Sequence, residues 1–205
     1  PRRLAHGVGV MAVKVKICGI CTPEDACASV AAGADFLGLN FHPASPRCVT
    51  PEQARAIADA VPGAALVGVF VDAARARVED VAATVGLAAL QFHGAESPEY
   101  CRAWPWRTIK ALRAAAGTDL RELAARYATD YLLLDSFVPG VAGGTGVLLD
   151  PAAAIGLPSA RLFVAGGLRP ETVAAAVRTL RPFAVDVASG VEARPGRKDH
   201  AKIEA

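Results

Sequence analysis

The most reactive side chains in the sequence are two cysteines, in the motif Cys18-Gly19-Ile20-Cys21. As half of a zinc site the pair would need two further ligands, and no second C-x-x-C or H-x3-H motif supplies them, so we expect no metal site. As a redox pair it would stand where a strand ends and a helix begins, but the repeated pattern around it does not fit the small thioredoxin fold. Two interpretations stay open: Cys18 is a catalytic thiol whose thiolate is stabilised by Lys16, or it is an inert buried cysteine.

Two glycine-rich turns near the C-terminus could bind a phosphate group. They are Ala165-Gly166-Gly167-Leu168 and Ala188-Ser189-Gly190-Val191, and each leads toward a helix-like segment. Glycine lets backbone amides approach an anion closely, and the start of a helix adds partial positive charge. One Gly-Gly pair is usually only a turn, but two such turns after consecutive strands favour a phosphate site.

Short apolar runs position these residues, and they alternate with helix-like segments at a spacing of about 20 to 30 residues. The runs are 13–18, 35–41, 65–71, 88–93, 107–112, 131–135, 161–166 and 183–188. Eight strand–helix units in 205 residues predict a single-domain α/β protein, a (β/α)8 TIM barrel, in which loops seven and eight usually bind phosphate. A doubly wound open sheet shares the local pattern and is the alternative.

The sequence predicts the N-termini of several helices, where proline occupies the first helical position and an acidic residue lies in the first turn. These starts are Thr22-Pro23-Glu24-Asp25, Thr50-Pro51-Glu52-Gln53, Ser97-Pro98-Glu99 and Arg169-Pro170-Glu171. The helix patterns at 150–157 and after Asp199 are the weakest.

Alternation along the strands predicts which side chains face the inside of the barrel. If the continuously aliphatic face packs against the helices, then Val15 and Ile17 point outward and their neighbours point inward. The same rule assigns these polar side chains to the interior: Lys16, Cys18, Asn40, Gln91, His93, Lys110, Asp135 and Asp186. Each buried polar group needs a partner, so such a collection indicates a site rather than a packing core. Barrel enzymes place their sites at the C-terminal ends of the strands.

Composition and charge exclude several other classes of protein. The chain is 53% hydrophobic and 20% charged, and its net charge of +2 leaves no basic stripe for nucleic acid or a membrane surface. No apolar run approaches the roughly 20 residues of a membrane span. The expected partner is therefore a small molecule.

The number of cysteines predicts the cellular compartment of the protein, and the N-terminal residues predict where the barrel domain begins. Five cysteines form an odd set in a chain large enough to fold without disulfides, which favours free thiols and a cytoplasmic location. Residues 1–12 lack the apolar region of a secretory signal. We interpret them as a disordered extension or a cloning remnant ahead of the barrel domain 13–205, with Met11 as a candidate natural start.

A series of motifs from about residue 13 to 203 resembles phosphoribosylanthranilate isomerase of tryptophan biosynthesis. The motifs follow one another in unbroken order: Val15-Lys16-Ile17-Cys18-Gly19-Ile20, Pro23-Glu24-Asp25-Ala26, Gly33-Ala34-Asp35, Ser45-Pro46-Arg47, Gln91-Phe92-His93-Gly94, Leu133-Leu134-Asp135, Gly143-Gly144-Thr145-Gly146, Ala165-Gly166-Gly167-Leu168 and Asp186-Val187-Ala188-Ser189-Gly190-Val191-Glu192. The first and last of these, together with P-G-x-K-D-H at 195–200, are the most specific.

The resemblance implies an Amadori rearrangement of N-(5-phosphoribosyl)anthranilate, in which the ribose ring opens and a proton leaves C2 to give the 1-deoxyribulose ketone. By the family's pattern Asp135 is the general acid that protonates the ring oxygen, and Cys18 is the general base that removes the C2 proton. These roles require a raised pKa for Asp135 and a thiol at Cys18 that loses its proton readily.

The resemblance also implies how the substrate is held. Arg47 matches the anchor of the anthranilate carboxylate, and a guanidinium fork suits a planar carboxylate. Gly166, Gly167, Ser189 and Gly190 would hold the phosphate. Asp186 would reach a ribose hydroxyl or orient a neighbouring side chain. No cofactor or metal is implied, and the chain would act as a monomer or homodimer.

Departures from the family's pattern keep other hypotheses open. After Gly143-Gly144-Thr145-Gly146 the family commonly continues with a lysine and later a tryptophan, whereas this chain has Val147 and Pro151. Cys21 replaces the more usual threonine, which removes a helix-capping hydroxyl. One alternative is a catalytically silent barrel that binds a phosphorylated metabolite. Another is the related Amadori reaction of histidine synthesis, which normally uses paired aspartates, so a cysteine at position 18 argues against it.

Overall fold

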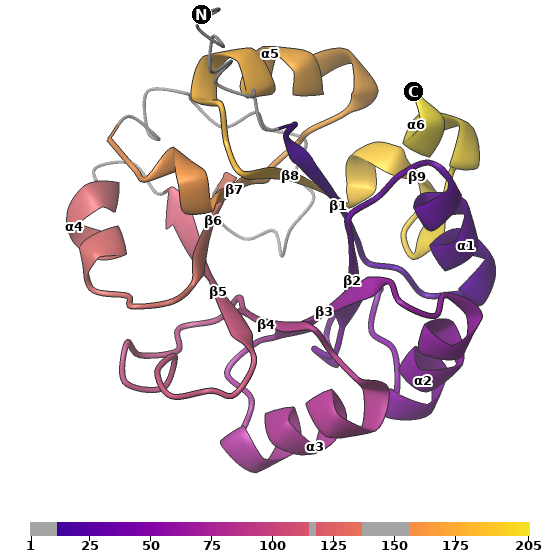
Figure 1. Cartoon of the computed structure of the whole chain (residues 1–205), viewed down its shortest axis with the longest axis horizontal. Helices are drawn as coiled ribbons and strands as arrows, with labels where there is room; N and C mark the ends of the chain where they lie inside the picture. The colour runs from indigo at the N-terminus through magenta and orange to yellow at the C-terminus, as the bar shows by residue number, and fades with distance from the viewer. Residues whose placement is uncertain (1–11, 115–117, 137–155) are drawn as a thin grey trace, which may run out of the picture.

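The computed structural model describes residues 12–114, 118–136 and 156–205. Eight parallel strands form a closed barrel in the order β1 to β8, because β1 pairs with both β2 and β8. Seen down the barrel axis, the strands form an inner ring and the helices lie outside it (Figure 1). This confirms the predicted (β/α)8 barrel and excludes the open sheet.

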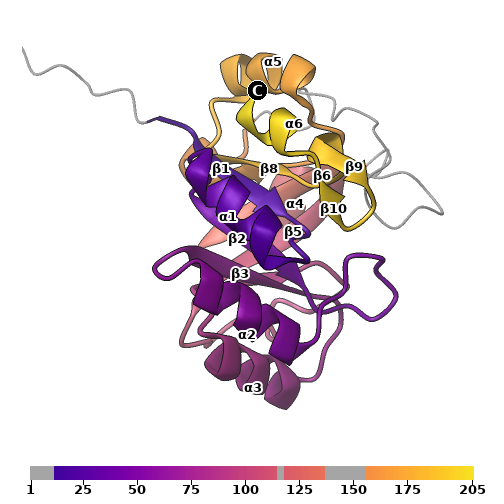
Figure 2. The ribbon, with the colours of Figure 1, turned by 90° about the vertical axis from the view of Figure 1, so that its right-hand side faces the viewer.

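The strands of the barrel agree with the predicted apolar runs to within a few residues. They are β1 Lys14–Cys18, β2 Phe36–Asn40, β3 Ala65–Phe70, β4 Ala89–Phe92, β5 Arg107–Ala114, β6 Tyr131–Ser136, β7 Leu162–Val164 and β8 Ala184–Val187. A separate hairpin of β9, Glu192–Arg194, and β10, Arg197–Lys198, follows β8 and lies beside α1 (Figure 2).

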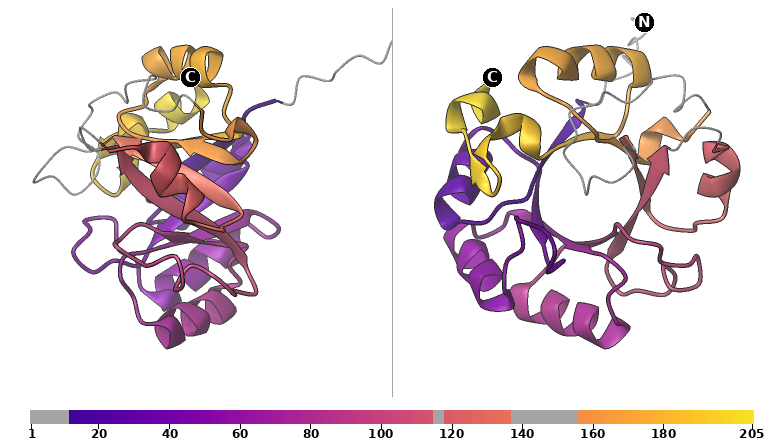
Figure 3. Two further views of the ribbon diagram at one scale, coloured as in Figure 1. Left: turned by 90° about the vertical axis from the view of Figure 1, so that its left-hand side faces the viewer. Right: turned by 180° about the vertical axis from the view of Figure 1, so that it is seen from behind.

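The described helices are α1 Pro23–Ala31, α2 Pro51–Ala60, α3 Arg75–Val85, α4 Leu120–Ala125, α5 Pro170–Leu180 and α6 His200–Glu204, with short 3-10 turns at Ser159–Arg161 and Ser189–Val191. Views from the side and from behind show the same ring of helices around the strands (Figure 3). No described helix is long and apolar enough to span a membrane.

Three of the four predicted helix starts are confirmed, because α1, α2 and α5 begin at Pro23, Pro51 and Pro170. Thr22 Oγ1 accepts a hydrogen bond from the backbone of Asp25, and Thr50 and Gln53 form a reciprocal capping box at the start of α2. The loss of a capping hydroxyl expected at Cys21 is therefore wrong, because the neighbouring Thr22 supplies it.

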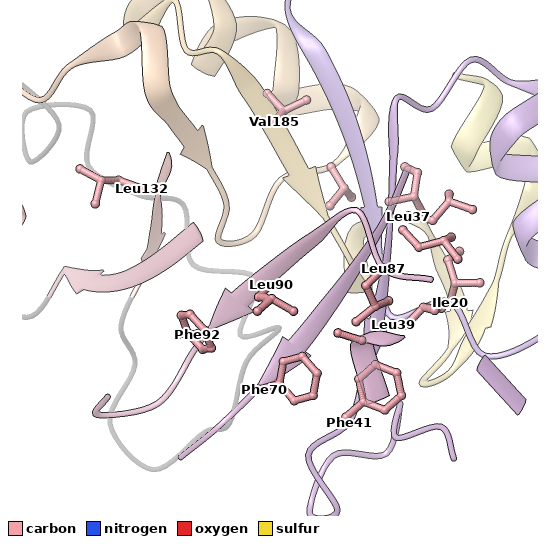
Figure 4. Close-up of a cluster of buried hydrophobic side chains, with 14 of the residues drawn as sticks. Ile20, Leu37, Leu39, Phe41, Phe70, Leu87, Leu90, Phe92, Leu132 and Val185 are labelled. Carbon is pink, nitrogen blue, oxygen red and sulfur yellow. The ribbon is translucent and has the colours of Figure 1, made fainter. Parts of the chain in front are cut away.

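Alternation of the strands separates the buried residues into two layers. The outer layer joins strands to helices and includes Ile17, which was predicted to face outward. Leu90, Phe92 and Leu132 belong to the same layer (Figure 4). The inner layer consists of Val67, Ala89, Ile109, Ala111, Leu133, Phe163, Ala165 and Ala184. Aromatic rings of Phe36, Tyr131, Phe163 and Phe183 pack on one another and fill the amino-terminal end of the barrel, with centroid separations from 4.9 to 6.4 Å. The carboxyl end is thereby left for polar groups.

The helix predicted after Ser97 does not form. The amides of Cys101 and Arg102 donate to the carbonyls of Ser97 and Glu99 and form turns. Ala103 then adopts a positive φ of 56°, and Pro105 has no amide to continue a helix. Residues 98–101 form a turn instead, and 102 and 103 are bends. The weak helix predicted after Asp199 does form, as α6. The one predicted at 150–157 lies outside the described residues, apart from a turn at 156 and 157.

The predicted inward position of Lys110 is wrong. Its neighbours Ile109 and Ala111 line the interior, so Lys110 points outward from β5. There its Nζ donates to the carbonyl of Gly94 and to Glu96 Oε2, both at 2.7 Å. The rule that the aliphatic face points outward fails on this strand because the interior is also apolar.

Candidate active site

The predicted site residues lie at one end of the barrel. Cys18 is the last residue of β1, His93 follows β4, and Asp135 is the next-to-last residue of β6. All eight strands are parallel, so their carboxyl ends share one rim. The chain therefore brings a thiol and a carboxyl to the same end of the molecule from strands far apart in sequence.

Cys18 is half-buried beside a buried ion pair. Lys16 Nζ lies 2.8 Å from Asp186 Oδ1, and the side chains of these residues are only 0% and 7% exposed. Gly38 on β2 makes room for the sulfur, since a Cβ at that position would lie 2.7 Å from Sγ. Lys198 Nζ donates to the carbonyl of Cys18 at 2.6 Å. The backbone that carries the thiol is thus held by Lys198, and the sulfur packs closely over Gly38.

The electrostatics of Cys18 differ from the expectation of a readily ionised thiol. Burial raises the pKa of Cys18, and the lowering by Lys16 and Lys198 does not overcome it. For Lys16, burial alone would lower the pKa, but Asp186 and Cys18 outweigh it and raise the pKa. In the free site the stable arrangement is therefore a neutral thiol beside a charged lysine.

Asp135 is connected to two residues on β4 and its loop. Asp135 Oδ2 lies 3.3 Å from His93 Nε2, and Gln91 Nε2 lies 2.8 Å from His93 Nδ1. Gln91 is 1% exposed, whereas His93 and Asp135 have side chains 22% and 18% exposed. The inward positions predicted for these three residues agree with this arrangement.

Arg47 lies in the loop after β2 and is held by Glu192 in β9. Its Nε and Nη2 donate to the two carboxylate oxygens of Glu192 at 2.8 and 2.7 Å. Gly19 has a φ of +74°, and a Cβ there would lie 2.5 Å from the Arg47 side chain, so glycine is required under it. No described residue accepts a hydrogen bond from Nη1, so one edge of the guanidinium fork is used and the other is available.

Glu192 and Lys198 are site residues that sequence reasoning missed. Lys198 Nζ lies 3.1 Å from Glu192 Oε1, and both side chains are nearly inaccessible to solvent. Burial would raise the pKa of Glu192, but Arg47 and Lys198 outweigh it and lower the pKa, while burial lowers the pKa of Lys198. Both residues lie in motifs on which the family resemblance rests, at 186–192 and 195–200, and this was the signal from which they could have been identified as site residues.

The two glycine turns lie against each other. A Cβ on Gly190 would lie 1.8 Å from the carbonyl oxygen of Leu168, so the loops after β7 and β8 are in close contact. Gly166 and Gly167 have positive φ angles of 86° and 66°. Within the described chain, the amides of Gly166, Gly167, Ser189 and Gly190 find no backbone acceptor outside the regular elements. They are thus available to an anion near the start of α5.

Among the described residues, no group of three or more His, Cys, Asp or Glu side chains could hold a metal ion. The loop-six positions Val147 and Pro151 lie outside the described residues, as do residues 1–11 of the expected N-terminal extension.

Comparison with known proteins gives one consistent result. Residues 15–205 match the family model described as N-(5′-phosphoribosyl)anthranilate (PRA) isomerase. The chain is 48% identical over 198 residues to N-(5′-phosphoribosyl)anthranilate isomerase of Magnetococcus marinus, covering 94% of this chain and 92% of that one. It is 47% identical over 196 residues to the protein of that name from Pseudomonas fluorescens, with 95% and 96% covered.

Solved structures agree with the sequence relatives. The phosphoribosyl anthranilate isomerase of Thermotoga maritima matches with a TM-score of 0.85 and 42% identity, over 94% of this chain and 96% of that one. A phosphoribosyl anthranilate isomerase in complex with reduced 1-(o-carboxyphenylamino)-1-deoxyribulose 5-phosphate matches with a TM-score of 0.81 and 42% identity, over 94% and 95% of the two chains.

Proposed function

The chain belongs to the N-(5′-phosphoribosyl)anthranilate isomerase family, and from this premise we propose how its residues perform the reaction of that family in tryptophan biosynthesis. The substrate is N-(5-phosphoribosyl)anthranilate, and the product is 1-(2-carboxyphenylamino)-1-deoxyribulose 5-phosphate. We propose Asp135 as the general acid and Cys18 as the general base.

In the first step Asp135 gives its proton to the ring oxygen of the ribose. The bond between that oxygen and C1 breaks, its electron pair goes to the oxygen, and the anilino nitrogen forms an iminium with C1. Cys18 then removes the proton from C2, and the electrons of the C–H bond neutralise the iminium to give an enolamine. In the last step C1 takes the proton from Cys18 and the C2 hydroxyl gives its proton to Asp135, so the enolamine becomes the ketone and both residues return to their starting states.

The observation that supports these roles is the placement of one thiol and one carboxyl at the same rim, each with a neighbour suited to its role. Lys16 beside Cys18 favours the thiolate, and Lys198 adds a second positive charge. Because burial raises the pKa of the thiol in the free site, Cys18 must release its proton to solvent before the C2 step, and the positive charge of the iminium intermediate favours that release.

We propose Arg47 as the anchor of the anthranilate carboxylate. The pair with Glu192 occupies Nε and Nη2, which turns Nη1 and the second hydrogen of Nη2 toward a ligand. That edge of the guanidinium presents two parallel N–H groups, the geometry that a planar carboxylate accepts.

We propose the amides of Gly166, Gly167, Ser189 and Gly190 as the phosphate site, supported by the contact between the two turns. We propose that Asp186 Oδ2 accepts a hydrogen bond from a ribose hydroxyl, since Oδ1 already accepts one from Lys16 Nζ. Besides this substrate we propose no nucleic-acid, membrane or cofactor partner.

A cytoplasmic location and a monomeric or homodimeric state are also proposals for this chain. The five cysteines are free, which fits a reducing compartment. A solved relative from T. maritima is described as monomers of a dimeric enzyme, at 40% identity and a TM-score of 0.83. Size-exclusion chromatography with light scattering distinguishes the two states.

The roles of Asp135 and Cys18 are tested by following the loss of anthranilate-substrate fluorescence with Cys18→Ala and Asp135→Asn. Each variant should lose about 10²- to 10⁴-fold in kcat, the usual contribution of a general acid or base. Cys27→Ala, at an exposed thiol on α1, is the matched control. Turnover by both variants at the parent's rate would show that the assigned mechanism is wrong.

A further inference from the structure

Gln91 is a buried polar residue whose side chain contacts a single polar partner in the described structure. It is 1% exposed, and its Nε2 lies 2.8 Å from His93 Nδ1. Its Oε1 is buried without a hydrogen-bond partner among the residues that the structure describes. Burying an amide with an unpaired oxygen lowers the stability of the fold, and an aliphatic side chain of equal size would avoid that cost. The hydrogen bond to His93 is therefore the feature that an aliphatic residue at this position could not provide.

The Gln91 contact selects the tautomer of His93. A primary amide nitrogen can only donate, so His93 Nδ1 must accept and cannot carry a proton. The proton of the neutral imidazole then lies on Nε2, which faces Asp135 Oδ2 at 3.3 Å. His93 thereby presents its one N–H to the carboxyl group, at a distance of 3.3 Å at which the free site does not yet form a hydrogen bond.

We propose that Gln91 and His93 are positioning residues that prepare Asp135 for its acid step, an inference that rests on the proposed role of Asp135. When the Nε2–H of His93 donates to Oδ2 in the substrate complex, the transferable proton of the carboxyl group is the one on Oδ1. That oxygen then faces the ring oxygen of the substrate.

This arrangement helps the reaction because the hydrogen bond strengthens as the proton leaves. Oδ2 belongs to a neutral acid before transfer and to a carboxylate afterwards, and donors bind an ionised acceptor more strongly than a neutral one. The Nε2–H of His93 therefore stabilises the later state more than the earlier one, which lowers the barrier of the acid step. The distance of 3.3 Å in the free site leaves room for this contact to shorten.

The tautomer is tested directly by 15N–1H NMR of substrate-free protein labelled at its histidine rings. The chain has four histidines, and His93→Leu identifies the signals of His93. The parent should show an unprotonated Nδ1 and a protonated Nε2. Gln91→Glu replaces the donor with an acceptor, so its spectrum should show a protonated Nδ1. A protonated Nδ1 in the parent at neutral pH would overturn the proposal.

Kinetics test the consequence for catalysis. Gln91→Glu and Gln91→Met should lower kcat roughly 10- to 100-fold, the loss expected when a hydrogen bond to a charged group is removed. KM should change less than about threefold, because the contact matters in the transition state rather than in substrate binding. Ile109→Val, at the neighbour of Gln91 in register on β5, is a control for packing. A kcat within about twofold of the parent in Gln91→Met would contradict the proposal.

A double-variant cycle separates a relay through His93 from a general effect on folding. If Gln91 acts only through His93, then Gln91→Met should cause no further loss of kcat in a His93→Leu background. An equal loss in both backgrounds would overturn the proposal. Asp135→Asn distinguishes the two levels: an active Asp135→Asn refutes the proposed acid, whereas an inactive one beside an unaffected Gln91→Met refutes only the relay.

Discussion

Replacing Glu192 with glutamine removes the carboxylate that holds two cations at the rim of the barrel. Glu192 receives two hydrogen bonds from Arg47, at 2.8 and 2.7 Å, and lies 3.1 Å from Lys198 Nζ. Glutamine preserves the volume, but its amide nitrogen would face a donor of Arg47, so one of the two hydrogen bonds is lost along with the charge.

The expected cost follows from the burial of the partners. Breaking a buried ion pair by removing one partner costs about 3–5 kcal/mol, because the other charge stays buried. The Lys198 side chain is 0% exposed, but that of Arg47 is 14% exposed, so water relieves part of the cost for Arg47. We expect the free energy of unfolding to fall by about 3 kcal/mol. For a chain of this size that lowers the Tm by roughly 6–12 °C.

Thermal unfolding followed by circular dichroism at neutral pH measures the stability, and the fluorescence assay measures KM. Because Glu192 also orients Arg47, KM should rise while kcat changes less. Glu79→Gln is the matched control: Glu79 forms an exposed ion pair with Arg75 on α3, and its side chain is 46% exposed. That control should cost less than about 0.5 kcal/mol.

The pH dependence of Glu192→Gln provides the refuting result. Arg47 and Lys198 lower the pKa of Glu192 below its ordinary value of 4.5, so its stabilisation is fully present above that pH. It is lost as the pH falls through the lowered pKa of the folded state. The difference in Tm between parent and variant should therefore be constant near neutrality and shrink in acid. A Tm within about 2 °C of the parent at neutral pH, or a difference that does not shrink, would refute the reasoning.

Two further predictions concern the thiol and the phosphate turns. Lys16→Met leaves Asp186 beside Cys18 without its cation, so the pKa of Cys18 should rise further. Alkylation of Cys18 at pH 8, measured on its peptide by mass spectrometry, should therefore be slower than in the parent. An unchanged alkylation rate would contradict this. Gly190→Ala places a Cβ 1.8 Å from the carbonyl of Leu168. The turns must separate, so inhibition by inorganic phosphate should weaken by about 10²-fold, and inhibition equal to the parent's would exclude this phosphate site.

The sequence alone determined most of the local structure and the fold class. Alternating aliphatic residues predicted the strands, and prolines after hydroxyl residues predicted the starts of α1 and α2, because these signals act between near neighbours in the chain. Eight repeats were enough to predict the barrel, since repeated βα units must bury both faces of a parallel sheet. Where the local signal was overruled, as after Ser97, a positive φ at Ala103 and a proline ended the turn.

Only the tertiary structure decided which charges meet. Lys16 and Asp186 are 170 positions apart, and Arg47 and Glu192 are 145 apart, so no local pattern could pair them before the barrel closed. The outward direction of Lys110 also depended on closure, because both faces of β5 carry apolar residues. The protonation of Cys18 depended on it too: its ordinary pKa belongs to a solvated thiol, and burial between β1 and β2 raises it despite the neighbouring lysines. The hydrophobic periodicity that predicts strands and helices is a property of neighbouring residues in the sequence. Ion pairing and pKa values depend instead on distances and solvent access that exist only once the chain has folded.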